Sequence, residues 1–291
     1  MAKSGIVRVG ISGWTYAPWR GVFYPGGLAQ RRELSYTASK FPAIEINGTF
    51  YGLQRPEHFA RWKEATPDDF VFAVKGPRFI THMRKLRDVE TPLANFFASG
   101  LLRLDAKLGP ILWQFSPAMR FDPGLFRAFF DQLPTDTTAA IALARQHDTR
   151  LDRRDWLRSE AKQAVRHAVE IRNESFCCAE FIKLLRAYKI ALVCADTVKW
   201  PLLMDLTGDF VYCRLHGSKE LYVSGYGPKA LDRWARRIEA WARGGEPDDA
   251  TRVLPPTKPL KRGRDVFVFF DNDVKVRAPA DAAALAKRLV R

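Results

Sequence analysis

The segment AIEINGTFY, residues 43–51, has the apolar character of a buried strand, but a glutamate and an asparagine interrupt it. Successive strand residues point to opposite faces, so Ile44 and Ile46 share one face while Glu45 and Asn47 share the other. Surrounding helices need the two isoleucines as contacts. Glu45 and Asn47 must then point toward the axis of a closed barrel, near its carboxyl end.

Eight segments of apolar, β-branched or aromatic residues recur along the 291-residue chain, with room for helices between them. They cover residues 7–12, 43–47, 70–75, 109–115, 167–172, 190–196, 209–216 and 266–272. Helical patterns cover residues 31–40, 56–65, 92–107, 123–132, 155–165, 177–188, 229–243 and 279–290. This alternation predicts a parallel sheet with right-handed crossovers. We therefore expect an α/β fold, a single (β/α)8 TIM barrel forming one domain over residues 1–291.

An open, doubly wound sheet is the competing fold. Such a sheet usually carries a glycine-rich phosphate turn after its first strand. Here that turn is GISGW, residues 10–14, which lacks the G-x-G-x-x-G spacing and continues into aromatic residues. The barrel is favoured, and residues 14–30 then form a long first βα loop of the kind that often carries function.

The composition indicates the class of partner. The chain carries 47 Lys and Arg against 32 Asp and Glu, a formal net charge of +15, which favours an anionic small molecule or nucleic acid. No apolar run reaches the roughly 20 residues of a membrane helix, and the start of the chain lacks a signal-peptide pattern, so we expect a cytoplasmic protein without membrane association. The four cysteines lack zinc-type spacing and are interpreted as reduced core residues. The oligomeric state stays open.

Six further strands end in a polar side chain. Strand alternation either places that side chain on the inward face or is compatible with that orientation. The resulting ring comprises Glu45, Asn47, Lys75, Gln114, Glu170, Arg172, Asp196, Arg214, His216 and either Asp271 or Asn272. A buried charge is costly unless it is paired, and the carboxylates and cations of this ring nearly balance. Barrel enzymes build their active sites at this mouth. We interpret the ring as a candidate active site, and the alternative is a salt-bridge plug that only closes the barrel.

Side-chain chemistry divides the mouth into two sets of candidate residues. The candidate catalytic residues are Glu45, Glu170, His216, Asp196 and Lys75. The candidate substrate-binding residues are Asn47, Trp14, Tyr51, His82, Gln114, Arg172, Arg214, Asp271 and Asn272. Trp14 and Tyr51 belong to an aromatic-rich rim that would stack on a sugar or a base, unless these rings only pack the loops.

A set of motifs in fixed order resembles a known family. They are GISGW at 10–14, FYP at 23–25, EINGTFY at 45–51, FVFAVK at 70–75 with ITH at 80–82, KLGPILWQFSP at 107–117, HAVEIRNESF at 167–176, ADT at 195–197 with WP at 200–201, RLHG at 214–217 and FFDND at 269–273. Together they resemble the YecE-like family, the proteins of domain of unknown function 72. The resemblance implies a TIM barrel and a mainly bacterial and archaeal distribution, and it implies no particular activity.

Three kinds of function fit the ring. The first is a hydrolase or lyase for a phosphorylated or nucleic-acid-derived substrate, whose phosphate would bind to Lys75, Arg172 and Arg214. The second is a sugar-active enzyme that uses Glu45 and Glu170 as its carboxylate pair. The third is a non-enzymatic barrel that binds a nucleotide or RNA. No nucleophile motif or P-loop decides among them.

The sequence leaves a metal cofactor undecided. The ring offers Mg²⁺ or Mn²⁺ several oxygen and imidazole donors, namely Glu45, Glu170, Asp196, His216 and Asp271. Only His216 and His82, of five histidines in the chain, are expected near the mouth, which argues against a histidine-rich zinc cluster. A metal-free site fits the same residues.

Overall fold

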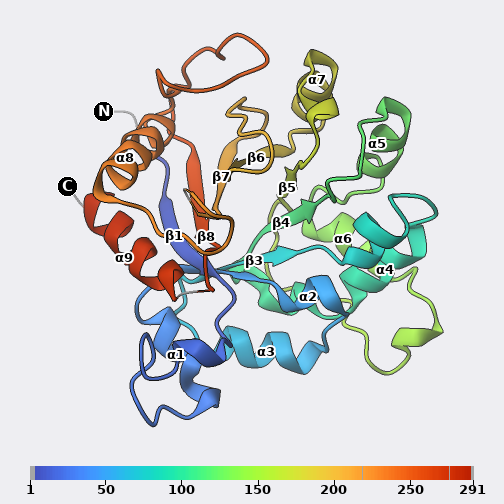
Figure 1. The fold of residues 1–291 in the computed structure, drawn as a ribbon. Coiled ribbons are helices and arrows are strands. Elements are labelled where there is room, and N and C mark those ends of the chain that lie inside the picture. The colour runs from blue at the N-terminus through green and yellow to red at the C-terminus, as the bar shows by residue number, and fades with distance from the viewer. Residues whose placement is uncertain (1–3, 218, 275, 290–291) are drawn as a thin grey trace.

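The computed structural model describes residues 4–217, 219–274 and 276–289 (Figure 1). Eight parallel strands form a closed barrel in chain order, and the last strand pairs with the first. The strands are β1 (Val7–Ser12), β2 (Ala43–Ile46), β3 (Val71–Lys75), β4 (Leu108–Gln114), β5 (His167–Glu170), β6 (Ala191–Asp196), β7 (Phe210–Leu215) and β8 (Asp265–Phe270). The predicted TIM-barrel fold is confirmed.

The helices surround this barrel (Figure 1). They are α1 (Glu33–Ala38), α2 (Gly48–Tyr51), α3 (Pro56–Glu64), α4 (Glu90–Ala98), α5 (Pro123–Phe130), α6 (Thr137–Ala144), α7 (Ala179–Tyr188), α8 (Pro228–Ala242) and α9 (Arg277–Leu289). Proline opens α3, α5 and α8, where its missing N–H costs no hydrogen bond. A π-helical turn, Phe79–Met83, follows β3. The predicted long first βα loop is confirmed, and it contains the 3₁₀ turns Ala17–Trp19 and Gln30–Arg32.

The helix predicted at residues 155–165 is wrong. The second helix of that crossover is α6, which begins where the Asp136 carboxylate accepts a hydrogen bond from the Ala139 N–H at 2.8 Å. The later segment instead runs in irregular conformation. It is held by tertiary contacts such as the stacking of Arg103 against Trp156 at 4.2 Å and the hydrogen bond from the Trp156 N–H to the Ala98 carbonyl oxygen at 2.8 Å. Tertiary packing therefore overrides the local helical pattern here.

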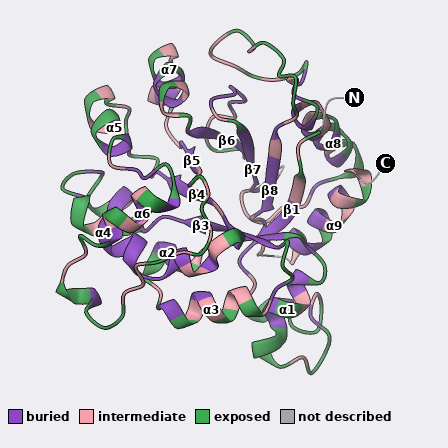
Figure 2. Ribbon diagram, turned by 180° about the vertical axis from the view of Figure 1, so that it is seen from behind, coloured by how far each residue is buried: buried purple, intermediate pink, exposed green. Residues whose placement is uncertain are grey.

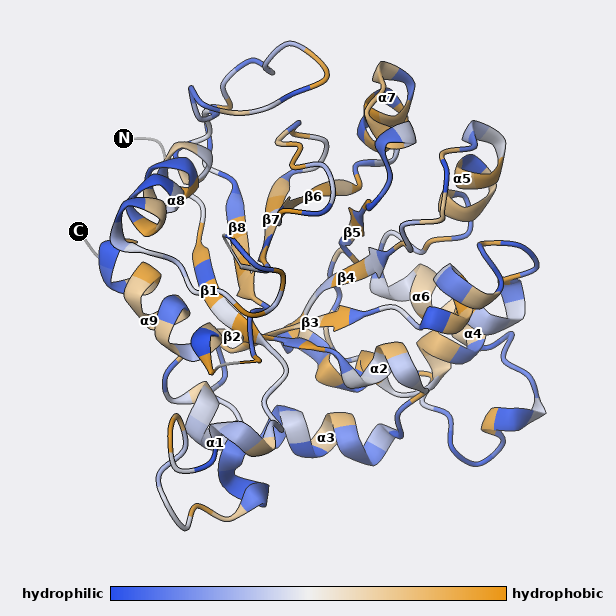
Figure 3. Ribbon diagram, in the orientation of Figure 1, coloured by the Kyte–Doolittle hydropathy of each residue, from blue (hydrophilic) through white to orange (hydrophobic). Residues whose placement is uncertain are grey.

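Strand alternation separates the barrel interior from the helix-facing core. The interior contains the buried side chains Ala43, Val71, Ala73, Leu112, Ala168, Ala191, Val193, Ala195, Phe210, Tyr212, Phe267 and Phe269. Ile44, Ile46 and Val169 belong to the larger cluster between strands and helices. Figure 2 shows the strands as largely buried, and Figure 3 shows apolar residues along β7 and β8. The predicted orientation of the residues flanking Glu45 is therefore confirmed.

No helix among the described residues combines the length and the apolar character needed to cross a bilayer.

Candidate active site

Arg214, near the end of β7, is the centre of the barrel mouth. Its fully buried guanidinium binds Glu45 through two contacts, Nε to Oε2 at 3.0 Å and Nη2 to Oε1 at 2.8 Å. It also donates from Nη1 to Glu170 Oε2 at 2.6 Å and from Nη2 to Asp271 Oδ2 at 2.7 Å. One cation therefore joins carboxylates from β2, from β5 and from the residue that follows β8.

Further donors complete the bonding of the two glutamates. Ser12 Oγ donates to Glu45 Oε1 at 2.8 Å, and the Tyr212 hydroxyl donates to Glu45 Oε2 at 2.6 Å. Arg172 Nε donates to Glu170 Oε1 at 2.8 Å. Both glutamates have no exposed surface. They form a satisfied layer of ion pairs beneath the mouth rather than part of its open surface.

Electrostatics keep Glu170 and Asp271 ionised. Burial raises the pKa of Glu170, but the charges of Arg214 and Arg172 outweigh that effect and hold the pKa well below its ordinary value. Burial likewise opposes ionisation of Asp271, while Arg214 and a contact with His216 lower its pKa to about 2. Ionised carboxylates at neutral pH are the state that matches the buried guanidinium.

His216 closes one side of the layer. Its Nδ1 lies 3.1 Å from Asp271 Oδ2 and its Nε2 lies 3.6 Å from Glu170 Oε2, although neither nitrogen makes a well-aligned hydrogen bond. The imidazole is fully buried and meets the rings of Trp200 and Tyr222 at nearly right angles. The predicted catalytic histidine therefore lies among the ion pairs and contacts no open space.

A cavity of about 750 Å³ opens above the ion pairs and is here called the mouth cavity. Its lining consists of Tyr16, Asn47, Phe50, Tyr51, Lys75, Arg78, His82, Met83, Gln114, Arg172, Tyr222, Asp271 and Asp273. The predicted residues Asn47, Tyr51, Lys75, His82, Gln114, Arg172 and Asp271 are thus brought together. Asn47 Oδ1, which has almost no accessible surface, finds no hydrogen-bond partner among the described residues. A concave site of this size with convergent polar groups is typical of small-molecule binding.

Lys75, the last residue of β3, has an unusual environment within the mouth cavity. Its side chain is only 8% exposed, and its Nζ lies 4.3 Å from the centre of the Phe50 ring. Within the described parts of the chain, its ammonium has no hydrogen bond and no ion pair with a carboxylate. Burial, reinforced by the charge of Arg214, lowers the pKa of Lys75 to about 8. This amine is therefore close to titration at physiological pH.

Two further titratable groups line the same cavity. Burial and the neighbouring Asp271 charge raise the pKa of Asp273 to about 6. Burial and the charge of Arg172 lower the pKa of His82, whose Nδ1 lies 2.8 Å from the hydroxyl of Thr81. Asp273 and Lys75 thus have pKa values of about 6 and about 8, on either side of neutrality, the property expected of groups that exchange protons with a substrate.

Seven predicted residues do not line the mouth cavity. Four of them, Glu45, Glu170, Arg214 and His216, lie in the buried ion-pair layer beneath it, and the other three lie elsewhere. Asp196 follows Ala195, which points into the barrel, so Asp196 faces the helices and accepts a hydrogen bond from Trp234 Nε1 at 2.8 Å. Its predicted place in the inward ring is therefore wrong. Asn272 also faces the helices and donates to Asp281 Oδ2 at 2.8 Å, which leaves Asp271 as the inward residue after β8. Trp14, in the first loop, packs edge-on against Trp62 of α3.

Six residues of the mouth cavity were not predicted as site residues, namely Tyr16, Phe50, Arg78, Met83, Tyr222 and Asp273. Asp273 continues the inward alternation beyond the end of β8, so strand parity was a signal that could have identified it. Arg78 and Tyr222 come from loops, where no periodic signal exists. Tyr222 accepts a hydrogen bond from Arg172 Nη2 at 3.2 Å and so helps to fix that guanidinium.

The donor groups of the ring do not fit a metal ion. The described residues contain no group of three or more His, Cys, Asp or Glu side chains arranged to hold one. The carboxylates of Glu45, Glu170 and Asp271 converge instead on the guanidinium of Arg214, which takes the position that a cation would need. The Mg²⁺ or Mn²⁺ site considered from the sequence therefore lacks free ligands in this cluster.

Replacing the central cation tests the geometry of the ring. Arg214→Met leaves buried carboxylates without their partner, so the free energy of unfolding at pH 7 should fall by about 3–5 kcal/mol. Urea denaturation at several pH values measures the change. The deficit should shrink below about pH 5, because protonation then removes the charge repulsion. In the wild type, the contribution of ionised Asp271 is full above its ordinary pKa of 3.8 and is lost as the pH falls toward 2.

Arg243→Met is the matched control for this variant. Arg243 pairs with Glu239 on α8, and its side chain is 73% exposed, so its loss should cost less than about 1 kcal/mol. Equal small losses in both variants would contradict the central role of Arg214.

Comparison with known proteins supplies the family. The family model described as "Protein of unknown function DUF72" matches residues 8–291. The UPF0759 protein YecE of Escherichia coli K12 is 31% identical over 135 residues, 42% of this chain and 46% of that protein. The UPF0759 protein YunF of Bacillus subtilis 168 is 26% identical over 117 residues, 38% of this chain and 40% of that protein. The matched regions thus span less than half the length of these curated relatives.

Solved structures resemble this chain over nearly its whole length. A DUF72 family protein from Thermotoga maritima superposes with a TM-score of 0.75 at 23% identity, covering 98% of this chain and 100% of that one. A DUF72 family protein from Enterococcus faecalis V583 gives a TM-score of 0.68 at 18% identity, covering 98% and 95%. These similarities support the barrel fold, and the family model, which spans almost the entire sequence, shows that this chain belongs to the DUF72 family.

Proposed function

We propose that this protein is an enzyme of the hydrolase or lyase type that acts on a phosphorylated or nucleic-acid-derived substrate in the mouth cavity. Lys75 and Asp273 are the proposed proton-transfer pair. The observation that carries the proposal is the position of Lys75, which is buried, faces the cavity and has no ion-pair partner in the described residues. The buried Arg214 and the partly buried Arg172, the neighbouring cations of the mouth, are both paired.

A purely structural plug does not account for Lys75. A plug gains little from an ammonium without an ion-pair partner in a low-dielectric site. The Phe50 ring and the charges of Glu45, Asp271 and Glu170 offset its desolvation only in part, because the pKa of Lys75 is still lowered to about 8. A methionine of similar shape would fill the same space without that cost. Residues that lower stability in this way are common at functional sites.

Each member of the pair is in its working form near pH 7. Asp273, with a pKa of about 6, is mostly ionised and accepts a proton from an attacking water or from a substrate carbon. Lys75, with a pKa of about 8, is mostly protonated and donates its proton to the departing oxygen. The proton taken by Asp273 and the proton given by Lys75 balance, and exchange with solvent restores both groups.

The remaining cations of the cavity suit an anionic substrate. Arg172 and Arg78 both line it, and Arg78 has no carboxylate partner among the described residues. Guanidinium groups bind phosphate oxygens through paired hydrogen bonds. The chain's net charge of +15 would further attract such a substrate.

The sugar-active alternative finds less support in this geometry. It assigned acid and base roles to Glu45 and Glu170, but both glutamates lie under the cavity with their oxygens bonded. A glycosidase acid needs a raised pKa, whereas the pKa of Glu170 is lowered. We therefore assign these two residues a positioning role for Arg214 and Arg172.

Pyridoxal 5′-phosphate offers a direct probe, because it combines an aldehyde that reacts with accessible amines and a phosphate that binds arginine. We expect it to label Lys75 preferentially near pH 7, since this amine is partly neutral and lines the same cavity as Arg172. Borohydride reduction followed by peptide mass spectrometry locates the label. Inorganic phosphate should compete, and pyridoxal without the phosphate should label more weakly.

Lys107 provides the matched lysine. It is 6% exposed, similar to Lys75, but its Nζ donates to the Lys63 and Thr66 carbonyl oxygens at 2.7 Å. Labelling of Lys107 to the same extent as Lys75, or labelling of Lys75 that phosphate does not reduce, would count against the proposal.

A screen of phosphomonoesters, phosphodiesters and phosphorylated sugars tests the activity itself. For any substrate that is turned over, Lys75→Met and Asp273→Asn should each lower kcat by about 100-fold or more. The pH profile of kcat/KM should be bell-shaped, with limbs near the pKa values of about 6 and about 8. Lys40→Met is the control, since Lys40 also lies over an aromatic ring, Tyr36, but outside the mouth. If kcat is unchanged in both Lys75→Met and Asp273→Asn, these residues do not have the proposed proton-transfer roles.

A further inference from the structure

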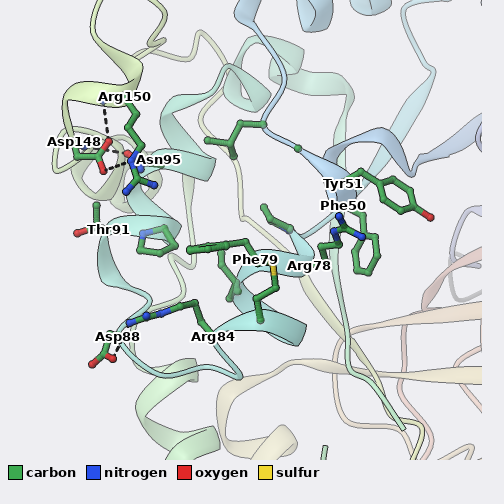
Figure 4. A pocket seen from close by; sticks show the side chains of 16 residues that line it. Phe50, Tyr51, Arg78, Phe79, Arg84, Asp88, Thr91, Asn95, Asp148 and Arg150 are labelled. Atoms are coloured by element: carbon green, nitrogen blue, oxygen red, sulfur yellow. Dashed lines mark hydrogen bonds and ion pairs between the residues drawn. The ribbon is translucent and has the colours of Figure 1, made fainter. Parts of the chain in front are cut away.

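A second cavity of about 580 Å³ lies next to the mouth cavity and is here called the annex (Figure 4). Phe50, Tyr51, Arg78 and Met83 line both cavities, so the two are adjacent. The annex alone is lined by Gly52, Leu53, Pro77, Phe79, Ile80, Arg84, Asp88, Thr91, Pro92, Asn95, Asp148 and Arg150. A ligand that occupies the mouth therefore has room to extend into the annex.

The annex gathers exposed apolar side chains. Tyr51 is 69% exposed, Leu53 40%, Phe79 39% and Met83 64%. These four are among nine large hydrophobic residues that are exposed in the described parts of the chain. Scattered exposure of this kind is ordinary, but concentration in one concave site marks a binding surface.

Charges divide the annex into a paired part and an unpaired part. Arg84 pairs with Asp88 at 2.8 Å and Arg150 pairs with Asp148 at 3.4 Å. Arg78 has no such partner in the described residues, and its guanidinium lies 5.5 Å from the Tyr51 ring. Because Arg78 lines both cavities, the unpaired positive charge belongs to the boundary between them.

The side of the annex opposite Arg78 is polar. Figure 4 shows Asn95, Asp148 and Arg150 together on that side, with Phe79 between them and Tyr51. Asn95 is 4% exposed, and its Oδ1 accepts a hydrogen bond from the Asp148 N–H at 3.0 Å. Its Nδ2 has no acceptor among the described residues. The annex thus combines aromatic walls with a buried, available donor.

The wall of the annex is built from uncommon backbone. The π-helical turn Phe79–Met83 places Phe79 and Met83 in the annex and His82 in the mouth. Lys85, Leu86 and Asp88 then adopt φ values of 50°, 67° and 48°, in the left-handed region that side chains disfavour. π-helical turns and strained residues of this kind concentrate at functional sites.

We propose that the annex binds the base of a nucleotide whose phosphate pairs with Arg78 and whose reacting bond lies in the mouth cavity. Aromatic walls stack on flat rings, and the Asn95 amide supplies a donor for the edge of a base. An aliphatic tail would use the apolar walls but would leave that donor without a partner. This inference rests on the proposed function and names its substrate class.

Isothermal titration calorimetry with AMP, GMP, CMP and UMP, compared with ribose 5-phosphate, tests the inference. At least one nucleotide should bind about tenfold more tightly than ribose 5-phosphate, which has the same phosphate and no base. Tyr51→Ala and Phe79→Ala should each lower the affinity for the nucleotide about tenfold. Phe79→Ala should leave the affinity for ribose 5-phosphate unchanged, because Phe79 lines only the annex, which that probe does not reach.

Leu53 and Leu260 form a matched pair, because both are 40% exposed and only Leu53 lines the annex. Leu53→Ala should weaken nucleotide binding and Leu260→Ala should not. Hexyl phosphate is the aliphatic probe. If it binds as tightly as the best nucleotide, the assignment of the annex to a base is overturned. Circular dichroism of each variant verifies that it is folded.

The outcomes separate the two proposals. Equal affinity for nucleotides and ribose 5-phosphate would overturn the annex inference and leave the phosphate site of the mouth intact. Nucleotide binding that none of the three annex variants weakens would overturn it as well. If neither a nucleotide nor ribose 5-phosphate binds, the proposed function and the annex inference both fail.

Discussion

The guanidinium of Arg214 binds three carboxylates that are far apart in the sequence, Glu45, Glu170 and Asp271. A cation without exposed surface is tolerated only when partners satisfy it, and here four hydrogen bonds do so. Because these partners come from β2, from β5 and from the end of β8, the cluster fixes the relative positions of strands around the mouth. The orientation of the side chains above the cluster depends on it.

This arrangement divides the mouth into a supporting layer and a reacting surface. The carboxylates that would be the obvious catalytic groups are bonded to Arg214 and Arg172 beneath the cavity. Lys75 and Asp273 lie above them, where burial brings both pKa values toward neutrality. The cavity extends from this pair toward Arg78 and the aromatic walls of the annex, which gives a ligand a reactive end, an anionic position and an apolar end.

Sequence periodicity predicted the barrel and much of the mouth, because strand parity alone determines which face a residue takes. It oriented Glu45, Glu170 and Arg214 correctly, since apolar and polar residues alternate around them. It failed at Asp196, where the strand IALVCAD is apolar on both faces and gives no parity signal. The depth of each residue along the barrel axis, the hydrogen bonds from Ser12 and Tyr212, and the loop residues Arg78 and Tyr222 depend on tertiary packing and leave no periodic trace.

The central claim is that Lys75 is a buried ammonium kept in the mouth at a cost to stability. Urea denaturation of the wild type and of Lys75→Met, compared over a range of pH, tests it most directly. The folded-state pKa of about 8 lies below the ordinary value of 10.5, so the charged form is disfavoured in the fold. The cost of the buried charge to the free energy of unfolding is therefore full below about pH 8 and disappears above pH 10.5. The account predicts that Lys75→Met is more stable by about 1–2 kcal/mol at pH 7, with a gain that shrinks as the pH rises. A variant that is less stable than the wild type throughout this range would contradict it.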